Sequence, residues 1–219
     1  PEAVAMIRHA RLNGLEPDVI SYNAAISACE KGSRWQDAVG ILSGMRLLAV
    51  VPDVISYNAA ISACDKNADW ALGLFRSMRL CHVQPNLISY NAAVSATTKA
   101  ARWQDALGII RHMALRRLEP DVITCCAAVG ACEKGARWQE ALDMLHGLPV
   151  RCLESDVIMC NAAINACVAG CLWLAAVGIL GIMRLRRQEP DVITYNAVLS
   201  ACEKGAQWQE ALGTFHDMP

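Results

Sequence analysis

Residues 19–53 read VISYNAAISACEKGSRWQDAVGILSGMRLLAVVPD, and this 35-residue stretch decides the fold because the chain repeats it. Its tryptophan recurs at intervals of 35, 33, 35, 35 and 35 residues, as Trp35, Trp70, Trp103, Trp138, Trp173 and Trp208. A fixed period of this length is typical of one supersecondary unit stacked many times. We therefore predict a solenoid, which buries apolar surface between neighbouring units and has no central core.

Both halves of the stretch carry a helical pattern. Apolar residues recur at the i, i+3, i+4, i+7 spacing of a helix face, first at Tyr22, Ala25, Ile26 and Cys29 and then at Trp35, Ala38, Val39, Leu42 and Met45. Asp18 is the predicted N-cap of the first helix. Gly32 is expected to end that helix in a left-handed turn, and Pro52 to stop the second helix. Each unit is thus a predicted helix-turn-helix hairpin.

The same register divides the whole chain. We predict part of a unit (its second helix) over 1–18, repeats over 19–53, 54–86, 87–121, 122–156 and 157–191, and a partial repeat over 192–219. Because both ends fall inside a unit, we expect the chain to be a fragment of a longer protein. The second repeat is two residues short directly after Trp70. This predicts that its second helix loses part of its first turn.

Composition argues against several kinds of function. The formal net charge of −1 gives no overall field that attracts a polyanion, so nucleic-acid binding requires a local line of charge. Five of the 11 cysteines stand at one position of the repeat, where small buried thiols suit packing, in a reducing compartment. The sequence contains neither CxxC nor HxE spacing and no nucleophile–base arrangement. We expect no metal, no cofactor and no enzyme activity.

The units share the pattern VxxYNxxIxAxxKxxxxxxALxxxxxM followed by PD, which resembles the P-type pentatricopeptide repeat. A tetratricopeptide repeat would place its tryptophan in the first helix, whereas here tryptophan opens the second. The resemblance covers five complete and two partial units. It implies an all-α, right-handed α-solenoid of stacked helix-turn-helix repeats that binds single-stranded RNA at about one base per repeat. It further implies a chloroplast or mitochondrial protein of RNA processing, stability, editing or translation.

Two positions of each repeat carry polar side chains that suit base recognition. The fifth residue is a poor helix former whose amide either stays solvated or bonds the Watson–Crick edge of a base; these residues are Asn23, Asn58, Asn91, Cys126, Asn161 and Asn196. The last residue is by itself an ordinary N-cap; these residues are Asp53, Asn86, Asp121, Asp156 and Asp191. The resemblance implies that both positions together select the base.

The resemblance also supplies the expected RNA word. Asparagine followed by aspartate is similar to uridine-preferring pairs, here Asn23–Asp53, Asn91–Asp121 and Asn161–Asp191. Asn58–Asn86 is similar to a cytidine-preferring pair. Cys126–Asp156 matches no familiar pair, because a thiol is a weak donor and acceptor. The implied pyrimidine-rich word is U-C-U-N-U, and Asn196 has no paired last residue.

Two further positions recur. The second residue is always isoleucine and either packs in the core or, as the resemblance implies, sandwiches a base; the set is Ile20, Ile55, Ile88, Ile123, Ile158 and Ile193. A lysine ends most first helices, either stabilising the helix dipole or, as the resemblance supports, facing phosphates; the set is Lys31, Lys66, Lys99, Lys134 and Lys204.

The fifth repeat departs from this pattern. Residues 166–183 form an 18-residue run without a charged side chain. Its length reaches the lower limit of a membrane span, but Trp173 stays in phase and a turn is expected inside the run, so no membrane span is expected. We expect an exposed apolar patch, with Leu172 and Leu174, for a protein partner or self-association. The alternative function is accordingly a protein-interaction α-solenoid scaffold that does not read RNA.

Overall fold

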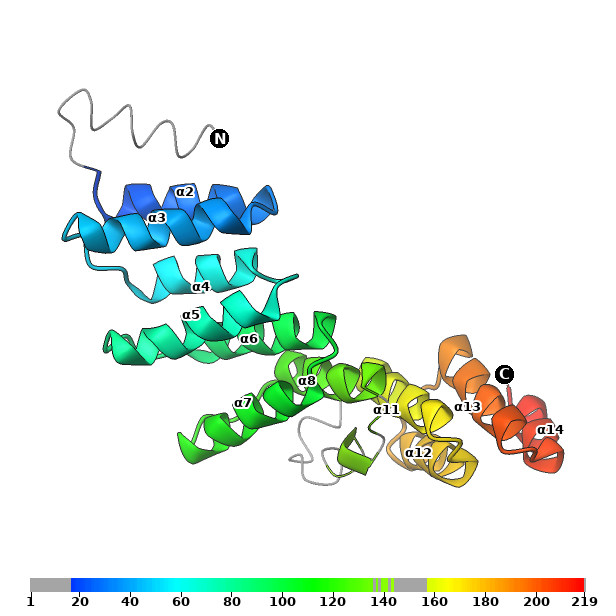
Figure 1. The fold of residues 1–219 in the computed structure, drawn as a ribbon. Coiled ribbons are helices and arrows are strands. Elements are labelled where there is room, and N and C mark those ends of the chain that lie inside the picture. The colour runs from blue at the N-terminus through cyan, green and yellow to red at the C-terminus, as the bar shows by residue number, and fades with distance from the viewer. Residues whose placement is uncertain (1–16, 136, 138, 142, 144–156, 219) are drawn as a thin grey trace. The chain divides into compact units, whose positions relative to one another are not determined.

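The computed structural model describes residues 17–218 except 136, 138, 142 and 144–156. Residues 1–16 of the expected partial unit, Trp138 and Asp156 lie outside the described residues. Every regular element in the described ranges is an α-helix, and successive helices form hairpins (Figure 1). The predicted all-α class of stacked helix-turn-helix units is confirmed. The chain divides into two compact units, residues 1–100 and 101–219.

The first unit contains five helices in its described part: α2 (Val19–Lys31), α3 (Trp35–Leu47), α4 (Val54–Ala63), α5 (Ala68–Leu80) and α6 (Leu87–Lys99). Helix α2 packs against α3 and α4, and α4 packs in turn against α5 and α6. The interfaces are filled by side chains with no exposed surface, among them Ile26, Met45, Tyr57, Ile61 and Met78. Apolar burial between neighbouring hairpins therefore holds this unit together.

The second unit continues the arrangement with α7 (Trp103–Leu115), α8 (Val122–Lys134), α11 (Val157–Ala169), α12 (Trp173–Leu185), α13 (Val192–Lys204) and α14 (Trp208–His216). Helix α11 packs against α8, α12 and α13, and α13 packs against α12 and α14. One apolar cluster runs through these helices and includes Val129, Met159, Ile164, Met183 and Val198. Small residues such as Ala163 and Ala166 lie fully buried among them and let the helices approach closely.

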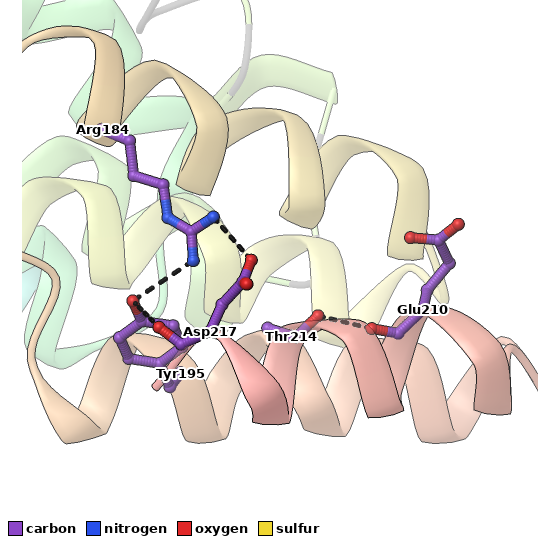
Figure 2. A network of polar contacts seen from close by, with 5 residues as sticks. All are labelled: Arg184, Tyr195, Glu210, Thr214 and Asp217. Carbon is purple, nitrogen blue, oxygen red and sulfur yellow. Dashed lines mark hydrogen bonds and ion pairs between the residues drawn. The ribbon is translucent and has the colours of Figure 1, made fainter. Parts of the chain in front are cut away.

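Polar contacts join the second helix of one repeat to the first helix of the next. In Figure 2, Arg184 of α12 bonds the Tyr195 hydroxyl of α13 at 3.3 Å and the carboxylate of Asp217 at 2.8 Å. The Tyr195 hydroxyl donates to the backbone carbonyl of Asp217 at 3.1 Å. Arg46 of α3 bonds Tyr57 of α4 in the same way in the first unit. These contacts satisfy the hydroxyl groups of tyrosines whose rings lie in the core.

The expected left-handed conformation of Gly32 is wrong. Gly32 has φ −84°, and the next residue, Ser33, is left-handed with φ 53°. Gly205 and Ala206 repeat this arrangement with φ −81° and 53°. Glycine is required at position 205 for a different reason, because a Cβ there would lie 2.5 Å from Cδ1 of Trp173. The close approach of a ring from the preceding repeat, rather than backbone conformation, accounts for this glycine.

The expected shortening of the second helix in repeat 2 is also wrong. Helix α5 has 13 residues, as many as α3, because it begins at Ala68 and takes in two residues before Trp70. Asp69 in its first turn favours this earlier start, since a carboxylate stabilises a helix N-terminus. The first helix is short instead: α4 has 10 residues where α2 has 13. Trp70 still reaches Trp35, with ring centroids 5.7 Å apart.

The apolar run over 166–183 contains the expected turn, because α11 ends at Ala169 and α12 begins at Trp173. Leu174 and Ile182 of α12 are exposed, whereas Leu172 packs against the core cluster and contributes less to the patch than expected. Within the described part, no helix combines the length and apolar character needed to cross a membrane.

Candidate nucleic-acid interface

The fifth residue of repeat 1 and the last residue of that repeat are in direct contact. The Asn23 amide nitrogen donates to the Asp53 carboxylate at 3.2 Å. Asp53 caps α4 by accepting the backbone N–H of Ser56 at 2.8 Å. The Ser56 hydroxyl donates to the carbonyl oxygen of Asn23 at 2.5 Å. Three side chains from two successive first helices thus form one polar cluster, which we call an amide triad.

The amide triad recurs at two other junctions inside the units. Asn58 donates to Asn86 at 3.2 Å and accepts from the Ser89 hydroxyl at 2.6 Å. Asn161 donates to Asp191 at 3.3 Å and accepts from the Thr194 hydroxyl at 2.6 Å. The three triads comprise Asn23, Asp53 and Ser56; Asn58, Asn86 and Ser89; and Asn161, Asp191 and Thr194. The structure thus brings together three of the residue pairs predicted from the sequence.

The members of the other predicted pairs are Asn91, Asp121, Cys126 and Asp156. Asn91 belongs to the first unit and Asp121 to the second, where Asp121 caps α8 through the N–H of Thr124 at 2.8 Å. Cys126 is half-buried and packs against the cluster that contains Met159. Its predicted partner, Asp156, lies outside the described residues. Asn196 of α13 is exposed.

Hydrogen bonding stabilises the charged form of the capping carboxylates. For Asp53, burial raises the pKa, but bonds from the Ser56 backbone, the Ser56 hydroxyl and the Asn23 amide outweigh it and hold the pKa below its ordinary value. For Asp191, the backbone N–H and the hydroxyl of Thr194 lower the pKa, and Asn161 adds to the effect. Ionised acceptors therefore stand beside Asn23 and Asn161 at neutral pH.

The six second-position isoleucines are all exposed, with 61–75% of their surface accessible. They are Ile20, Ile55, Ile88, Ile123, Ile158 and Ile193. This exposure does not fit the core-packing interpretation. One stiff apolar side chain per repeat, at the start of each first helix and three residues before the fifth position, leaves a series of open apolar faces beside the amides.

The five predicted lysines are exposed, but not all of them end a helix. Lys31, Lys99, Lys134 and Lys204 are the last residues of α2, α6, α8 and α13. Lys66 instead lies beyond α4, the short first helix of repeat 2, which ends at Ala63. Lys99 forms an ion pair with Asp65 of the preceding repeat. The lysines are therefore available at the ends of the first helices, and at least one is partly neutralised.

Sequence reasoning missed the third member of the amide triad. Ser56, Ser89 and Thr194 each stand three positions after an N-cap and complete a capping box. The bond from the same hydroxyl to the amide of the preceding repeat has no signature within one unit. It becomes visible only when successive first helices are placed side by side.

The buried cysteines are suited to packing. Burial raises the pKa of Cys64, Cys132 and Cys167 to about 11, so these thiols stay protonated at neutral pH. In the described residues no group of histidines, cysteines and acids is arranged to hold a metal ion. What the site offers chemically is amide donors and acceptors, apolar faces and lysines.

The fold and the amide triads define a helical repeat protein in which one polar cluster recurs between successive first helices at three junctions. Pentatricopeptide repeat domain models match residues 6–67, 73–135 and 144–204, and a PPR repeat model matches residues 193–219. The chain belongs to the pentatricopeptide repeat family. No curated protein sequence matches the chain closely enough to count as a relative.

Solved structures with the same fold include the crystal structure of the pentatricopeptide repeat protein PPR10 from maize, at a TM-score of 0.72 and 24% identity. The match covers 99% of this chain and 31% of PPR10, so the chain spans about a third of that protein. The crystal structure of PPR10 in complex with an 18-nt psaJ RNA element matches at a TM-score of 0.64 and 22% identity. This match covers 94% of this chain and 29% of PPR10.

The PPR domain of Arabidopsis thaliana protein-only RNase P 1, in complex with tRNA, gives a TM-score of 0.53 at 12% identity. That match covers 87% of this chain and 83% of the other.

Proposed function

We propose that the chain is a sequence-selective module for single-stranded RNA that reads about one base per repeat. The observation that carries the proposal is the contact of the fifth and last residues at Asn23–Asp53, Asn58–Asn86 and Asn161–Asp191. Each pair fixes an amide that is half-buried at Asn23 and has 9% of its surface accessible at Asn58 and Asn161. An exposed isoleucine lies three residues before each amide, which suits an unstacked base bonded at its edge and packed on its face. Solved pentatricopeptide structures in complex with RNA support the proposal.

The proposed target is the word U-C-U-N-U. Uridine is assigned to Asn23–Asp53, Asn91–Asp121 and Asn161–Asp191, and cytidine to Asn58–Asn86. The fourth nucleotide is unselected, because Cys126 brings a weakly bonding thiol to the position of the amide. On the family resemblance we further propose that this activity serves the processing, stability, editing or translation of chloroplast or mitochondrial RNA.

A mobility-shift assay with labelled oligonucleotides tests the proposal. RNA containing UCUNU is expected to bind more tightly than scrambled or purine versions of equal length. Each wrong base at a reading position is expected to weaken binding by about fivefold or more, the effect of losing an ordinary hydrogen bond. Changing the fourth nucleotide serves as the internal control and is expected to have no effect. Equal affinity for all sequences would reject base reading.

A second candidate function is the protein-interaction scaffold without RNA reading. Leu174 and Ile182, exposed on one face of α12, favour it. This candidate predicts that Leu174→Gln abolishes complex formation with a protein partner and leaves RNA affinity unchanged. A salt-independent complex, with no RNA bound at low salt, would favour the scaffold over the RNA module.

A further inference from the structure

The hydroxyl of each amide triad has a single proton and two oxygens within reach. Ser56 Oγ lies 2.5 Å from the Asn23 carbonyl oxygen and 2.9 Å from the Asp53 carboxylate. For Ser89 the corresponding distances are 2.6 and 3.0 Å, and for Thr194 they are 2.6 and 2.8 Å. The amide oxygen is the nearer acceptor at all three junctions. The hydroxyl thus lies within hydrogen-bond distance of both oxygens, and its shortest hydrogen bond is to the asparagine of the preceding repeat.

This bond determines which end of the amide faces which neighbour. The Asn23 nitrogen donates to Asp53, and its oxygen accepts from Ser56. Rotating the amide by half a turn would place its oxygen against the Asp53 carboxylate, acceptor against acceptor. The same rotation at Asn58 would bring its oxygen against the Asn86 side-chain oxygen that now accepts the bond. The hydroxyl and the last residue together hold one amide orientation.

The orientation matters because it determines where the remaining donor and acceptor of the amide lie. After the two bonds of the triad, each asparagine keeps one N–H and one carbonyl lone pair. A pyrimidine is told apart at N3, where uracil carries a donor and cytosine an acceptor. An amide of fixed orientation offers its donor and its acceptor at defined places, whereas an amide that turns over offers either group at either place. Because Asn23 and Asn58 have the same orientation, the choice between uridine and cytidine depends also on the last residue, Asp53 or Asn86.

The sequence supports the link between hydroxyl and amide. Asn23, Asn58, Asn91 and Asn161 are each followed, at the third residue of the next repeat, by serine or threonine: Ser56, Ser89, Thr124 and Thr194. Cys126 is followed instead by Met159, which has no exposed surface and packs in the apolar cluster. The hydroxyl is lost at the one junction where no amide needs to be oriented.

We propose that Ser56, Ser89 and Thr194 are positioning residues for base selection, each orienting the recognition amide of the preceding repeat. The proposal rests on the RNA-reading function proposed above and deepens it. Selectivity at a nucleotide is then set by three side chains, two from one repeat and one from the next.

The test measures base preference nucleotide by nucleotide in the full 219-residue chain. Two oligonucleotide series vary the first and the second base of UCUNU. Ser56→Ala is expected to reduce the preference for uridine over cytidine at the first base by about fivefold, the effect of one hydrogen bond, and to leave the second base unchanged. Ser89→Ala is expected to reduce the preference for cytidine over uridine at the second base and to leave the first base unchanged. Ser56→Thr, which keeps the hydroxyl, is expected to retain the wild-type preference.

Ser21→Ala is the matched control. Ser21 caps α2 together with Asp18 in the same geometry, since its backbone N–H and its hydroxyl both donate to the Asp18 carboxylate. Loss of a cap is therefore common to Ser21→Ala and Ser56→Ala, whereas loss of orientation at the Asn23 amide is confined to Ser56→Ala. Thr194→Val, read at the fifth base, preserves side-chain shape and guards against a folding defect in the alanine variants.

The possible results separate the two proposals. A wild-type chain with no base preference would reject the RNA-reading function and this inference with it. A selective wild-type chain whose Ser56→Ala variant keeps full preference at the first base would overturn the positioning role alone. The positioning role would also be overturned if Ser56→Ala and Ser21→Ala reduced the base preference equally at all nucleotides, because the loss of capping would then explain the result.

Discussion

At the scale of single residues, the capping carboxylates link stability to pH. The Thr194 backbone N–H and hydroxyl hold the pKa of Asp191 below its ordinary value of 3.8. A lowered folded-state pKa contributes stability that is present above the unfolded value and is lost as the pH falls through the folded value. We predict that Asp191→Asn reduces the slope of unfolding free energy against pH below about 3.8. Urea unfolding at pH values on both sides of 3.8 measures this slope.

Repeat 2 provides the converse experiment. The last residue of repeat 2, Asn86, caps α6 and forms the same capping box with Ser89. Because its side chain is an amide, it does not titrate. Asn86→Asp is expected to introduce an acid-sensitive cap and to steepen the slope that Asp191→Asn reduces. Two variants with slopes equal to that of the wild type would show that these caps do not contribute to acid unfolding.

Residue identities predicted part of the site. Asn23, Asn58 and Asn161 could be chosen from sequence because asparagine is unfavourable inside a helix and recurs in register. Their contacts with Asp53, Asn86 and Asp191 followed only from the family resemblance. The bond from Ser56 to Asn23 was not predictable, since it joins residues 33 positions apart whose closeness depends on how two hairpins stack.

At the scale of helices, the glycines after α8 and α13 accommodate tryptophan rings. A Cβ at Gly205 would lie 2.5 Å from Trp173, and one at Gly135 would lie 2.5 Å from Trp103. A Cβ at Gly32 would meet nothing closer than 3.4 Å. We predict that Gly205→Ala destabilises the chain by about 1–3 kcal/mol, as overpacking does, and that Gly32→Ala stays within about 0.5 kcal/mol of the wild type. Chemical denaturation of both variants gives the two values.

Both substitutions replace a glycine at the same position of the repeat with similar negative φ. Backbone entropy and helix-cap geometry therefore change equally in the pair. A destabilisation of similar size in Gly32→Ala would show that the glycines serve the backbone and not the rings.

The helices also mark where sequence patterns lose precision. Periodicity predicted the positions of α2, α3, α6, α7, α8 and α13 because apolar spacing and end signals agree there. In repeat 2 the tryptophan predicted that the deletion would shorten α5. The backbone instead continued the second helix back to Ala68 and shortened α4. The deletion thus shortens the first helix of the repeat and not the second, and the position of Trp70 in the sequence does not show which helix is shortened.

At the scale of the whole molecule, the period together with the helical spacing inside each unit predicted the fold class, whereas the electrostatics depend on pairings between repeats. A net charge of −1 is spread over 20 basic and 21 acidic residues. The sequence showed the lysines as a regular series but not which of them meet acids. Asp65 of repeat 2 lies against Lys99 of repeat 3, 34 residues further on. Binding of a polyanion by this nearly neutral chain therefore depends on which lysines remain unpaired.

Asp65→Asn tests this dependence. Removing the carboxylate leaves Lys99 free to meet a phosphate, and one additional phosphate contact steepens the fall of log affinity with log salt by about 0.7 for a single strand. Affinity for UCUNU RNA at low salt is expected to rise. Asp37→Asn makes the same charge change in the same unit, at the Arg34–Asp37 pair in the first turn of α3, and is expected to leave the slope unchanged. Mobility shifts over a salt series give both slopes, and equal steepening in the two variants would mean that net charge, rather than the freed Lys99, controls RNA affinity.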